Sequence, residues 1–260
     1  MSVPEIVVHR DAAELADAVA ARLVTRTVEV QAARGSASVV LTGGGLGIAS
    51  LAALAGSPAC DSVDWRNLDL WWGDERFVPA GDPDRNETQA RAALLDHVPL
   101  DPARVHPMPA SDGADGDDPE AAAERYATEL AAAAMPGDHG GLPRFDVLML
   151  GVGPDGHVAS LFPGQPATYE EARTVVGVRG SPKPPPVRIS LTFPAIRSAT
   201  EVWLVAAGAE KARALHLALS DAGPVQVPAA GARGMVRTLA MLDEAAASAL
   251  PPQLRRLASP

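Results

Sequence analysis

The chain has 260 residues, a formal net charge of −10 at pH 7 and a mean hydropathy near zero, and 47% of its residues are hydrophobic. This balance is typical of a soluble globular protein and excludes a disordered chain, which would carry far fewer apolar residues for its charge. A sequence pI near 5.0 argues against nucleic acid or an anionic membrane as a partner, because both require a basic surface.

Short apolar runs alternate along the chain with alanine-rich helical patterns, which is the signature of a parallel α/β sheet. In the first half, Asp11 is suited to cap a helix over 11–34. Strands are predicted over 37–42 and 68–72, and a helix over 48–55 follows a glycine run at 43–47. Asn86 with Gln89 resembles a capping box that opens a helix over 87–98.

In the second half, residues 101–117 are rich in proline, glycine and aspartate and indicate an exposed loop. Asp118-Pro119 then opens a helix that ends near 135, and a loop over 136–143 leads to an apolar strand over 146–150. Further strands are predicted over 174–178, 187–192 and 202–206, with helices near 210–220 and 243–250. No change in composition marks a boundary, so we predict a single domain over residues 1–260.

The single cysteine, Cys60, excludes an intramolecular disulfide and a cysteine-based zinc cluster. The first residues, MSVPEIVVHRD, lack the basic and apolar regions of a signal peptide. No apolar run approaches the ~18–20 residues of a membrane span. We therefore expect a cytoplasmic protein that does not act at a membrane.

In parallel sheets, ligands bind beyond the carboxyl ends of the strands, so the loops that follow strands indicate the site. The first such loop is Thr42-Gly43-Gly44-Gly45, between a strand and a helix. Its glycines allow backbone N–H groups to converge on an anion at the helix N-terminus. The alternative is a tight strand–helix turn, and no Gly-Lys-Ser/Thr follows as in a Walker loop.

The second loop, WGDERF at 72–77, places charged residues directly after an apolar strand. Arg76 can bind a phosphate in a bidentate manner, and Asp74 can hold a sugar hydroxyl or transfer a proton. The alternative is a surface cluster of salt bridges.

The third loop begins at residue 151 and matches G-x-G-x-x-G, with Gly153 as its second glycine. A dinucleotide site is disfavoured, because Pro154 and Asp155 stand where a pyrophosphate needs bare backbone. Asp155 lies two residues before His157, and a carboxylate there can orient an imidazole. An imidazole of ordinary pKa, about 6.5, is a suitable general base at neutral pH. The alternative is a structural histidine.

The fourth loop, SPKPPPVR at 181–188, carries Lys183 and Arg188 among prolines that stiffen the segment. Two cations here suit a phosphate or carboxylate, and a rigid linker is the alternative. The other histidines lack metal-ligand spacing, so we predict no metal. No G-x-S-x-G elbow is present. The chemistry left is a base-activated water or a proton transfer on a phosphorylated small molecule.

These four loops in this order resemble the 6-phosphogluconolactonases, within the glucosamine-6-phosphate isomerase/6-phosphogluconolactonase superfamily. The resemblance covers most of the chain, through LTGGG at 41–45, WWGDERFVPAGDPDRNE at 71–87, DVLMLGVGPDGHVASLFPG at 146–164, SPKPPPVRISLTFPAI at 181–196 and GAEKA at 208–212. It implies a Rossmann-like, predominantly parallel sheet with helices on both faces. The implied activity is hydrolysis of 6-phospho-D-glucono-1,5-lactone to 6-phosphogluconate in the pentose phosphate pathway, without metal or redox cofactor.

The resemblance also implies roles for individual residues. His157 would be the base that activates water, oriented by Asp155. Arg76 and Lys183 would help to bind the anionic substrate, and Asp74 would contact the sugar. Gly153 belongs to the same loop as the base and is a further candidate for substrate binding. Arg188 and the loop of Thr42, Gly43, Gly44 and Gly45 would serve the phosphate. We expect a monomer, although no sequence pattern specifies the oligomeric state.

Two alternative functions stay open. In the sister isomerases/deaminases, a glutamate five residues after the histidine completes the proton relay, and Asp-Glu-Tyr stands where this chain has Asp74-Glu75-Arg76. Phe162 occupies the relay position here, so both differences favour the lactonase. A non-catalytic sugar-phosphate sensor is the third reading.

The chain departs from the family's frequent Gly-Gly-Ser-Thr-Pro in its first loop and so lacks two hydroxyl donors.

Overall fold

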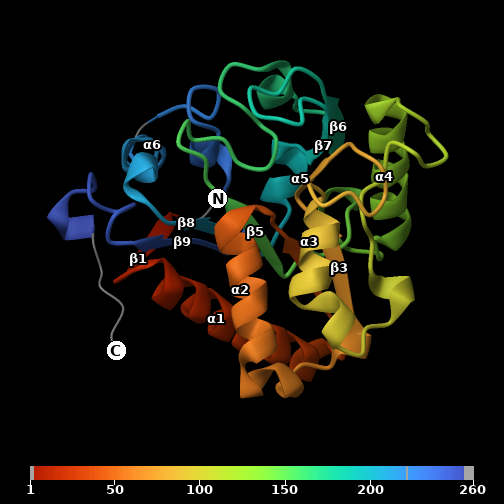
Figure 1. Ribbon diagram of the computed structural model, residues 1–260, viewed down its shortest axis with the longest axis horizontal. Helices are drawn as coiled ribbons and strands as arrows, with labels where there is room; N and C mark the ends of the chain where they lie inside the picture. Colours follow the sequence, from red (N-terminus) through yellow and green to blue (C-terminus); the bar gives the residue numbers. More distant parts are fainter. Residues whose placement is uncertain (1–2, 221, 255–260) are drawn as a thin grey trace.

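The computed structural model describes residues 3–220 and 222–254. Its centre is a sheet of parallel strands in the order β1-β9-β8-β5-β2-β3 (Figure 1). The strands are β1 (Pro4–His9), β2 (Ala37–Leu41), β3 (Leu68–Trp72), β5 (Val147–Gly151), β8 (Glu201–Ala206) and β9 (Arg237–Asp243). From β2 the chain moves outward to β3, whereas β5 leads to β8 on the other side. The crevice between β2 and β5 is therefore the topological switch point, where α/β sheets bind ligands.

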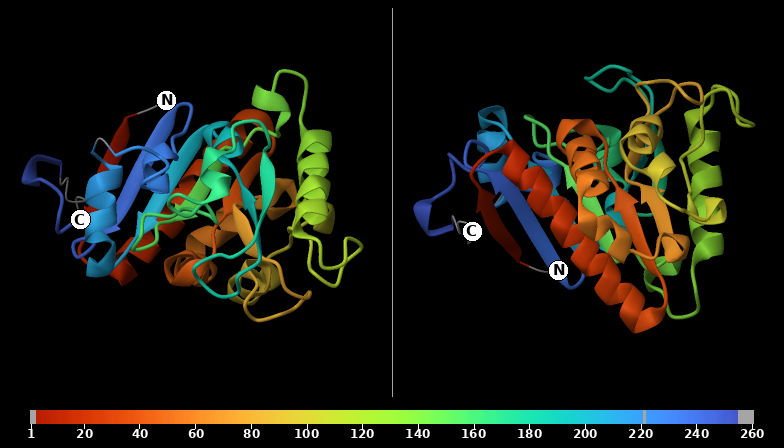
Figure 2. Two further views of the ribbon diagram at one scale, coloured as in Figure 1. Left: turned by 90° about the horizontal axis from the view of Figure 1, so that it is seen from above. Right: turned by 60° about the horizontal axis from the view of Figure 1, so that its bottom comes forward.

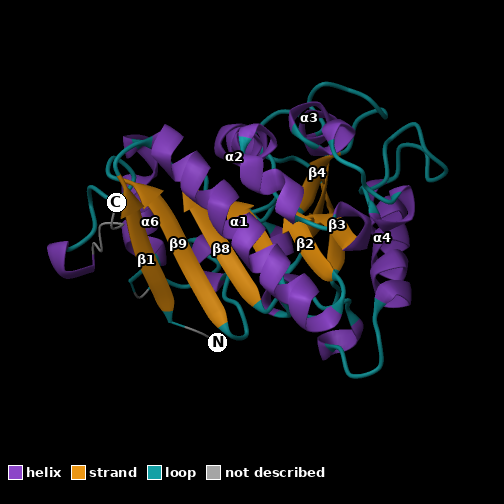
Figure 3. Ribbon diagram, turned by 90° about the horizontal axis from the view of Figure 1, so that it is seen from below, coloured by secondary structure: helices purple, strands orange, loops and turns teal. Residues whose placement is uncertain are grey.

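Helices cover both faces of this sheet, as the sequence predicted. They are α1 (Ala12–Arg34), α2 (Gly44–Gly56), α3 (Asn86–Ala93), α4 (Pro119–Ala133), α5 (Phe193–Arg197) and α6 (Ala212–Ala218). In Figure 3, α1 and α2 cross the near face of the sheet and α6 lies behind it. Because helices shield both faces, the central strands are mainly apolar, and every residue of β8 is buried.

A second, antiparallel sheet has the order β4-β7-β6, with β4 (Asp74–Arg76), β6 (Val175–Val178) and β7 (Arg188–Leu191). β4 follows β3 after Gly73 alone. α4 packs against β6, and Figure 2 shows the two next to each other. The register places Arg76 opposite Arg188. This small sheet therefore brings together the second and fourth candidate loops.

Some predicted elements have different bounds. α2 begins at Gly44 rather than at residue 48, so the glycine run forms its first turn. The predicted capping box is wrong: Arg85 is the N-cap of α3, the Asn86 side chain donates to Asp74, and that of Gln89 donates to the carbonyl of Pro83. α3 also ends at Ala93, well before residue 98.

The C-terminal helix predicted over 243–250 is not formed. Asp243 ends β9, and the residues after it form turns. The carboxylate of Asp243 accepts the amide of Ala246, as an N-cap would, but it also accepts the amide of Gly208 from the β8 side. The Asp243 side chain, predicted to start a helix, therefore binds backbone amides at the end of a strand instead. The strands β1, β4 and β9 were not predicted.

Candidate active site

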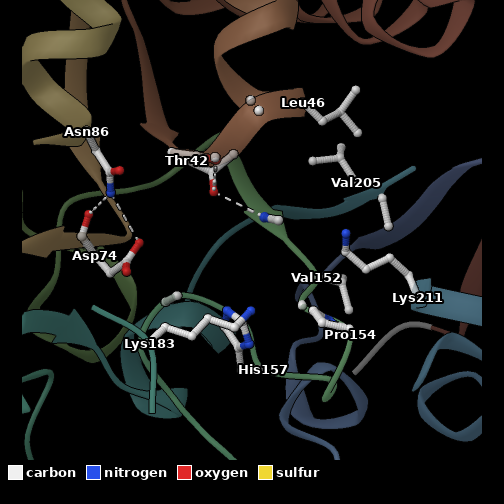
Figure 4. A pocket seen from close by; sticks show the side chains of 18 of the residues that line it. Thr42, Leu46, Asp74, Asn86, Val152, Pro154, His157, Lys183, Val205 and Lys211 are labelled. Atoms are coloured by element: carbon white, nitrogen blue, oxygen red, sulfur yellow. Dashed lines mark hydrogen bonds between the residues drawn. The ribbon is translucent and has the colours of Figure 1, made fainter. Parts of the chain in front are cut away.

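A pocket of about 510 Å³ opens at the switch point, beyond the carboxyl ends of β2, β5 and β8 (Figure 4). Ten of the residues predicted from the sequence line it: Thr42, Gly43, Gly44, Gly45, Asp74, Arg76, Gly153, His157, Lys183 and Arg188. Asp155 contacts His157 from behind. The four candidate loops thus meet in one cavity.

His157 and Asp155 form a close pair in the loop after β5. The imidazole Nδ1 lies 2.5 Å from Asp155 Oδ1, which also accepts the His157 amide at 3.3 Å. Partial burial alone would raise the pKa of Asp155, but the hydrogen bond and charge of His157 outweigh it and hold that pKa at about 2. With Nδ1 facing a carboxylate, Nε2 is the ring nitrogen available as a base.

Two neighbours fix the plane of the imidazole. A Cβ at Gly153 would lie 2.0 Å from His157 Cε1, so the ring occupies the space that a side chain at residue 153 would need. The buried Phe162 ring packs on the imidazole with centroids 4.6 Å apart. Phe162 therefore supports the ring sterically and offers no group that transfers protons.

Asp74 is held by three other segments. Its Oδ2 accepts the buried hydroxyl of Ser160 at 2.7 Å and lies 3.8 Å from Arg188 Nη1. Asn86 Nδ2 donates to the Asp74 carbonyl at 2.8 Å and lies 3.5 Å from Oδ1. Ser160 and Asn86 were not among the predicted site residues, because only the folded chain brings them to β4.

Arg188 lines the pocket and also holds the backbone of residues 183–185 in place. Its guanidinium donates to the carbonyls of Lys183, Pro184 and Pro185 and is almost fully buried. Burial lowers the pKa of Arg188, and the charge of Asp74 opposes this shift. The fourth loop thus places Lys183 and Arg188 on the lining of the pocket, and their binding of an anion stays a prediction.

Three more cations line the pocket. Arg76 donates to the carbonyl of Asp84 at 2.5 Å. Burial, with the charges of Lys211 and Arg188, lowers the pKa of Lys183, while Asp155 opposes the shift. Lys211, from the turn after β8, lines the pocket on the side of Val205 (Figure 4). Lys211 belongs to the GAEKA motif at 208–212, for which the sequence predicted no role in the site.

The glycine loop forms the start of α2. Gly43 is the N-cap and supplies no side-chain cap, and Gly44 has φ +80°. The first amides of a helix lack intrahelical partners and favour anions. The hydroxyl of Thr42 is engaged elsewhere, since it accepts the Gly151 amide at 3.1 Å and donates to the Gly43 carbonyl at 3.5 Å, which ties the loop after β2 to β5. Anion contacts from this loop therefore fall to the backbone.

Within residues 3–220 and 222–254, no group of three or more His, Cys, Asp or Glu could hold a metal ion. None of the helices in the same ranges is long and apolar enough to cross a membrane.

Known proteins resemble this chain over nearly its whole length. Residues 10–240 match the family described as "Glucosamine-6-phosphate isomerases/6-phosphogluconolactonase". The 6-phosphogluconolactonase of Streptomyces coelicolor is 66% identical over 96% of either chain. That of Mycobacterium tuberculosis is 51% identical over 95% of this chain and 98% of the relative. The solved 6-phosphogluconolactonase of Trypanosoma brucei has a TM-score of 0.81 at 30% identity, over 95% of this chain and 99% of that one.

The chain therefore belongs to the glucosamine-6-phosphate isomerase/6-phosphogluconolactonase family, as its motifs predicted. Its relatives place it on the 6-phosphogluconolactonase side of that family, among the enzymes that hydrolyse lactones. A solved monomeric glucosamine-6-phosphate deaminase shares the fold, with a TM-score of 0.75 at 20% identity.

Proposed function

We propose that the chain hydrolyses 6-phospho-D-glucono-1,5-lactone to 6-phospho-D-gluconate in the oxidative pentose phosphate pathway. The observation that carries this proposal is the His157–Asp155 pair, set in a pocket lined by four cationic side chains. A phosphorylated sugar needs the cations, and lactone hydrolysis needs a base. Phe162 against the imidazole favours hydrolysis over isomerisation, because no carboxyl group stands at that position.

In this mechanism Nε2 of His157 takes a proton from a water molecule, whose oxygen attacks the lactone carbonyl carbon. The carbonyl becomes a tetrahedral oxyanion, which collapses as the bond to the ring oxygen breaks. The imidazolium then returns its proton to that leaving oxygen. Because its pKa is about 2, Asp155 is a carboxylate at neutral pH, and it stabilises the imidazolium between these steps.

We assign the two ends of the substrate from the positions of the cations. Lys183 acts at the reacting end, because its side chain lies on the His157 side of the pocket (Figure 4) and its charge is near that of Asp155. The amides of Gly43 to Gly45, together with Lys211 on the same pocket, suit the phosphate. Asp74 contacts a sugar hydroxyl, with Arg76 and Arg188 balancing its charge. Arg188 mainly positions the loop of Lys183, since its guanidinium already donates to three carbonyls.

The test is hydrolysis of freshly generated lactone, with the spontaneous rate subtracted and the His157→Ala protein measured in parallel. We expect a rate well above background that falls by about 10²–10⁴-fold in the variant, the usual contribution of a general base. Near-normal turnover in His157→Ala would remove the assigned base. A wild-type rate equal to background would favour a sugar-phosphate sensor, and ammonia release from glucosamine 6-phosphate would favour the deaminase.

We also propose that residues 1–260 act as one domain, as a monomer in the cytoplasm. Both sheets of the same chain contribute to the described pocket, so one copy supplies the site without a second. Sedimentation equilibrium should give the mass of one chain, 26.8 kDa, and a mass twice as large would contradict the monomer.

A further inference from the structure

Glu75 is a fully buried carboxyl group that the proposed mechanism does not use. It lies on β4 between Asp74 and Arg76, both of which line the pocket. Because side chains alternate along a strand, Glu75 points to the opposite side, where its exposed fraction is 0%. Burial of a carboxyl group is costly unless it is well paired, so its contacts need an explanation.

The carboxylate of Glu75 accepts three backbone amides. Oε1 accepts from Arg76 at 2.8 Å and from Asn86 at 2.7 Å, and Oε2 accepts from Glu87 at 2.9 Å. Asn86 and Glu87 are the first residues of α3, whose own N-cap provides no side-chain acceptor. Glu75 therefore caps α3 from a neighbouring strand and fixes where this helix begins.

A buried cation completes the cluster. The guanidinium of Arg85, with an exposed fraction of 1%, lies 3.9 Å from Glu75 Oε2. It also donates to the carbonyl of Met108 at 2.7 Å and to Glu87 Oε2 at 3.3 Å. These bonds join β4, α3 and the loop before α4 behind the pocket wall.

The residue positioned by this cap is Asn86, which lines the pocket. Its amide group donates to Asp74 on one side (Figure 4). On the other side, its Oδ1 lies 1.9 Å from where a Cβ of Gly43 would be, so it is packed directly against the N-cap of α2. Asn86 thus spaces the β4 wall from the α2 wall of the pocket.

We propose that Glu75 is a positioning residue for substrate binding: by fixing the first turn of α3 it holds Asn86 between Asp74 and Gly43, and so sets the distance between the walls that bind the sugar and the phosphate. This role rests on the proposed function, which assigns those walls to one substrate. It acts on binding rather than on chemistry, because the hydrogen bonds of Glu75 and Asn86 go to β4 and to the first turn of α3 and not to His157 or Asp155.

The test compares Glu75→Gln, Asn86→Ala and the double variant. Glutamine retains one acceptor oxygen but turns an NH₂ group towards an amide that now lacks a partner. We expect each single variant to raise KM for the lactone, and Kd for 6-phosphogluconate by calorimetry, about fivefold or more, with kcat within about twofold of wild type. The Kd of the double variant should be no higher than that of the single variant that binds more weakly. Both substitutions act through the same contact, that of Asn86 between Asp74 and Gly43.

Glu87→Gln is the matched control. Its side chain contacts the same Arg85 but does not line the pocket, so stability should fall while KM and Kd stay within about twofold. A merely structural role for Glu75 predicts that Glu75→Gln behaves as this control does.

The proposal is overturned if folded Glu75→Gln binds 6-phosphogluconate as wild type does, if the loss is confined to kcat, or if the two single effects multiply. Should Glu75→Gln fail to fold, an unchanged Kd in Asn86→Ala overturns it equally. A wild-type protein that binds 6-phosphogluconate but does not turn over the lactone contradicts the hydrolytic function and leaves the Kd comparison decisive for Glu75. If wild type binds neither compound, both proposals are wrong.

Discussion

Asp155 and His157 are close in sequence, yet their side chains meet only because the loop between them is tightly folded over a glycine. Gly156 has φ +84° and allows the chain to turn, while Gly153 leaves room for the imidazole. The pair therefore depends on two residues that have no side chain at all.

Replacing Gly153 by alanine should displace the base. The new Cβ would lie 2.0 Å from His157 Cε1 and 2.7 Å from Asp155 Oδ1, so the pair cannot keep its geometry. A misplacement of about 1 Å costs on the order of 10²-fold in rate, and we expect kcat to fall by at least that factor. Steady-state kinetics measure this, with Gly56→Ala as the control, because a Cβ there meets nothing within 4 Å. Equal kcat values in the two variants would contradict the argument.

Glu75 should also make stability depend on pH. Burial raises its pKa to about 7, against Arg85 and the three backbone amides that favour the charged form. An unfolded glutamate titrates near ~4.3, so the folded protein holds this proton more tightly. Stability from this group is therefore fully present below about pH 4.3 and is lost as pH rises towards about 7.

The measurement is chemical denaturation of wild type and Glu75→Gln at pH 5 and pH 8. Wild type should lose more free energy of unfolding over this interval than the variant does, by up to about 3 kcal/mol. Other charged groups that face Glu75 from neighbouring elements, Arg85, Glu87 and Arg188, are present in both proteins and cancel in the difference. Parallel pH profiles would show that Glu75 stays ionised throughout.

At the scale of elements, local signals predicted what local interactions determine. Asp11 and Asp118 were predicted as helix caps, and each accepts an amide in the first turn of its helix. The strand β8 was evident from an apolar run. By contrast, β1 and β9 pair with each other although they lie far apart in the sequence. No pattern within PEIVVH or RTLAMLD specifies that pairing.

The site divides in the same way. His157, Asp155 and Lys183 could be proposed from the sequence, because each follows a strand in a distinctive loop. Asn86 and Lys211 could not, because only the folded chain brings α3 and the turn after β8 to the pocket. Ser160 likewise meets Asp74 only in the folded chain. The roles of all of these residues remain predictions to be tested by mutation.

The cap of α4 offers a test at this scale. Asp118 accepts the amide of Glu120 at 3.1 Å, and α4 packs against β6, away from the pocket. Asp118→Ala should lower the free energy of unfolding by about 1 kcal/mol, whereas Asp118→Asn retains an acceptor and should cost less. Thermal denaturation compares them, with kcat and KM unchanged in both. Equal losses would assign the effect to the charge beside Arg179 rather than to the cap.

For the whole molecule, the net charge of −10 opposes an anionic substrate, whereas the pocket presents Arg76, Lys183, Arg188 and Lys211. The pocket should dominate, because a bound phosphate lies within a few ångströms of these cations. Charges spread over the surface are screened beyond about 10 Å at 0.1 M salt. Attraction, not repulsion, should therefore govern binding.

We expect KM for the phosphorylated lactone to rise several-fold between about 0.02 and 0.5 M NaCl, with kcat nearly unchanged. The unphosphorylated lactone, assayed in the same way, should show little change in KM. A KM that falls with salt would mean that the overall negative charge controls substrate capture.

The pairing of the outermost strand has a consequence for synthesis. Among the described strands β1 comes first, yet its partner β9 comes last, with Pro4 opposite Thr238. A ribosome releases the chain from its N-terminus, so β1 must wait, unpaired and apolar, while nearly all the other elements emerge. The pairing of β1 with β9 is then a late event that follows translation. A nascent chain stalled before β9 would expose β1 to chaperones or to neighbouring chains.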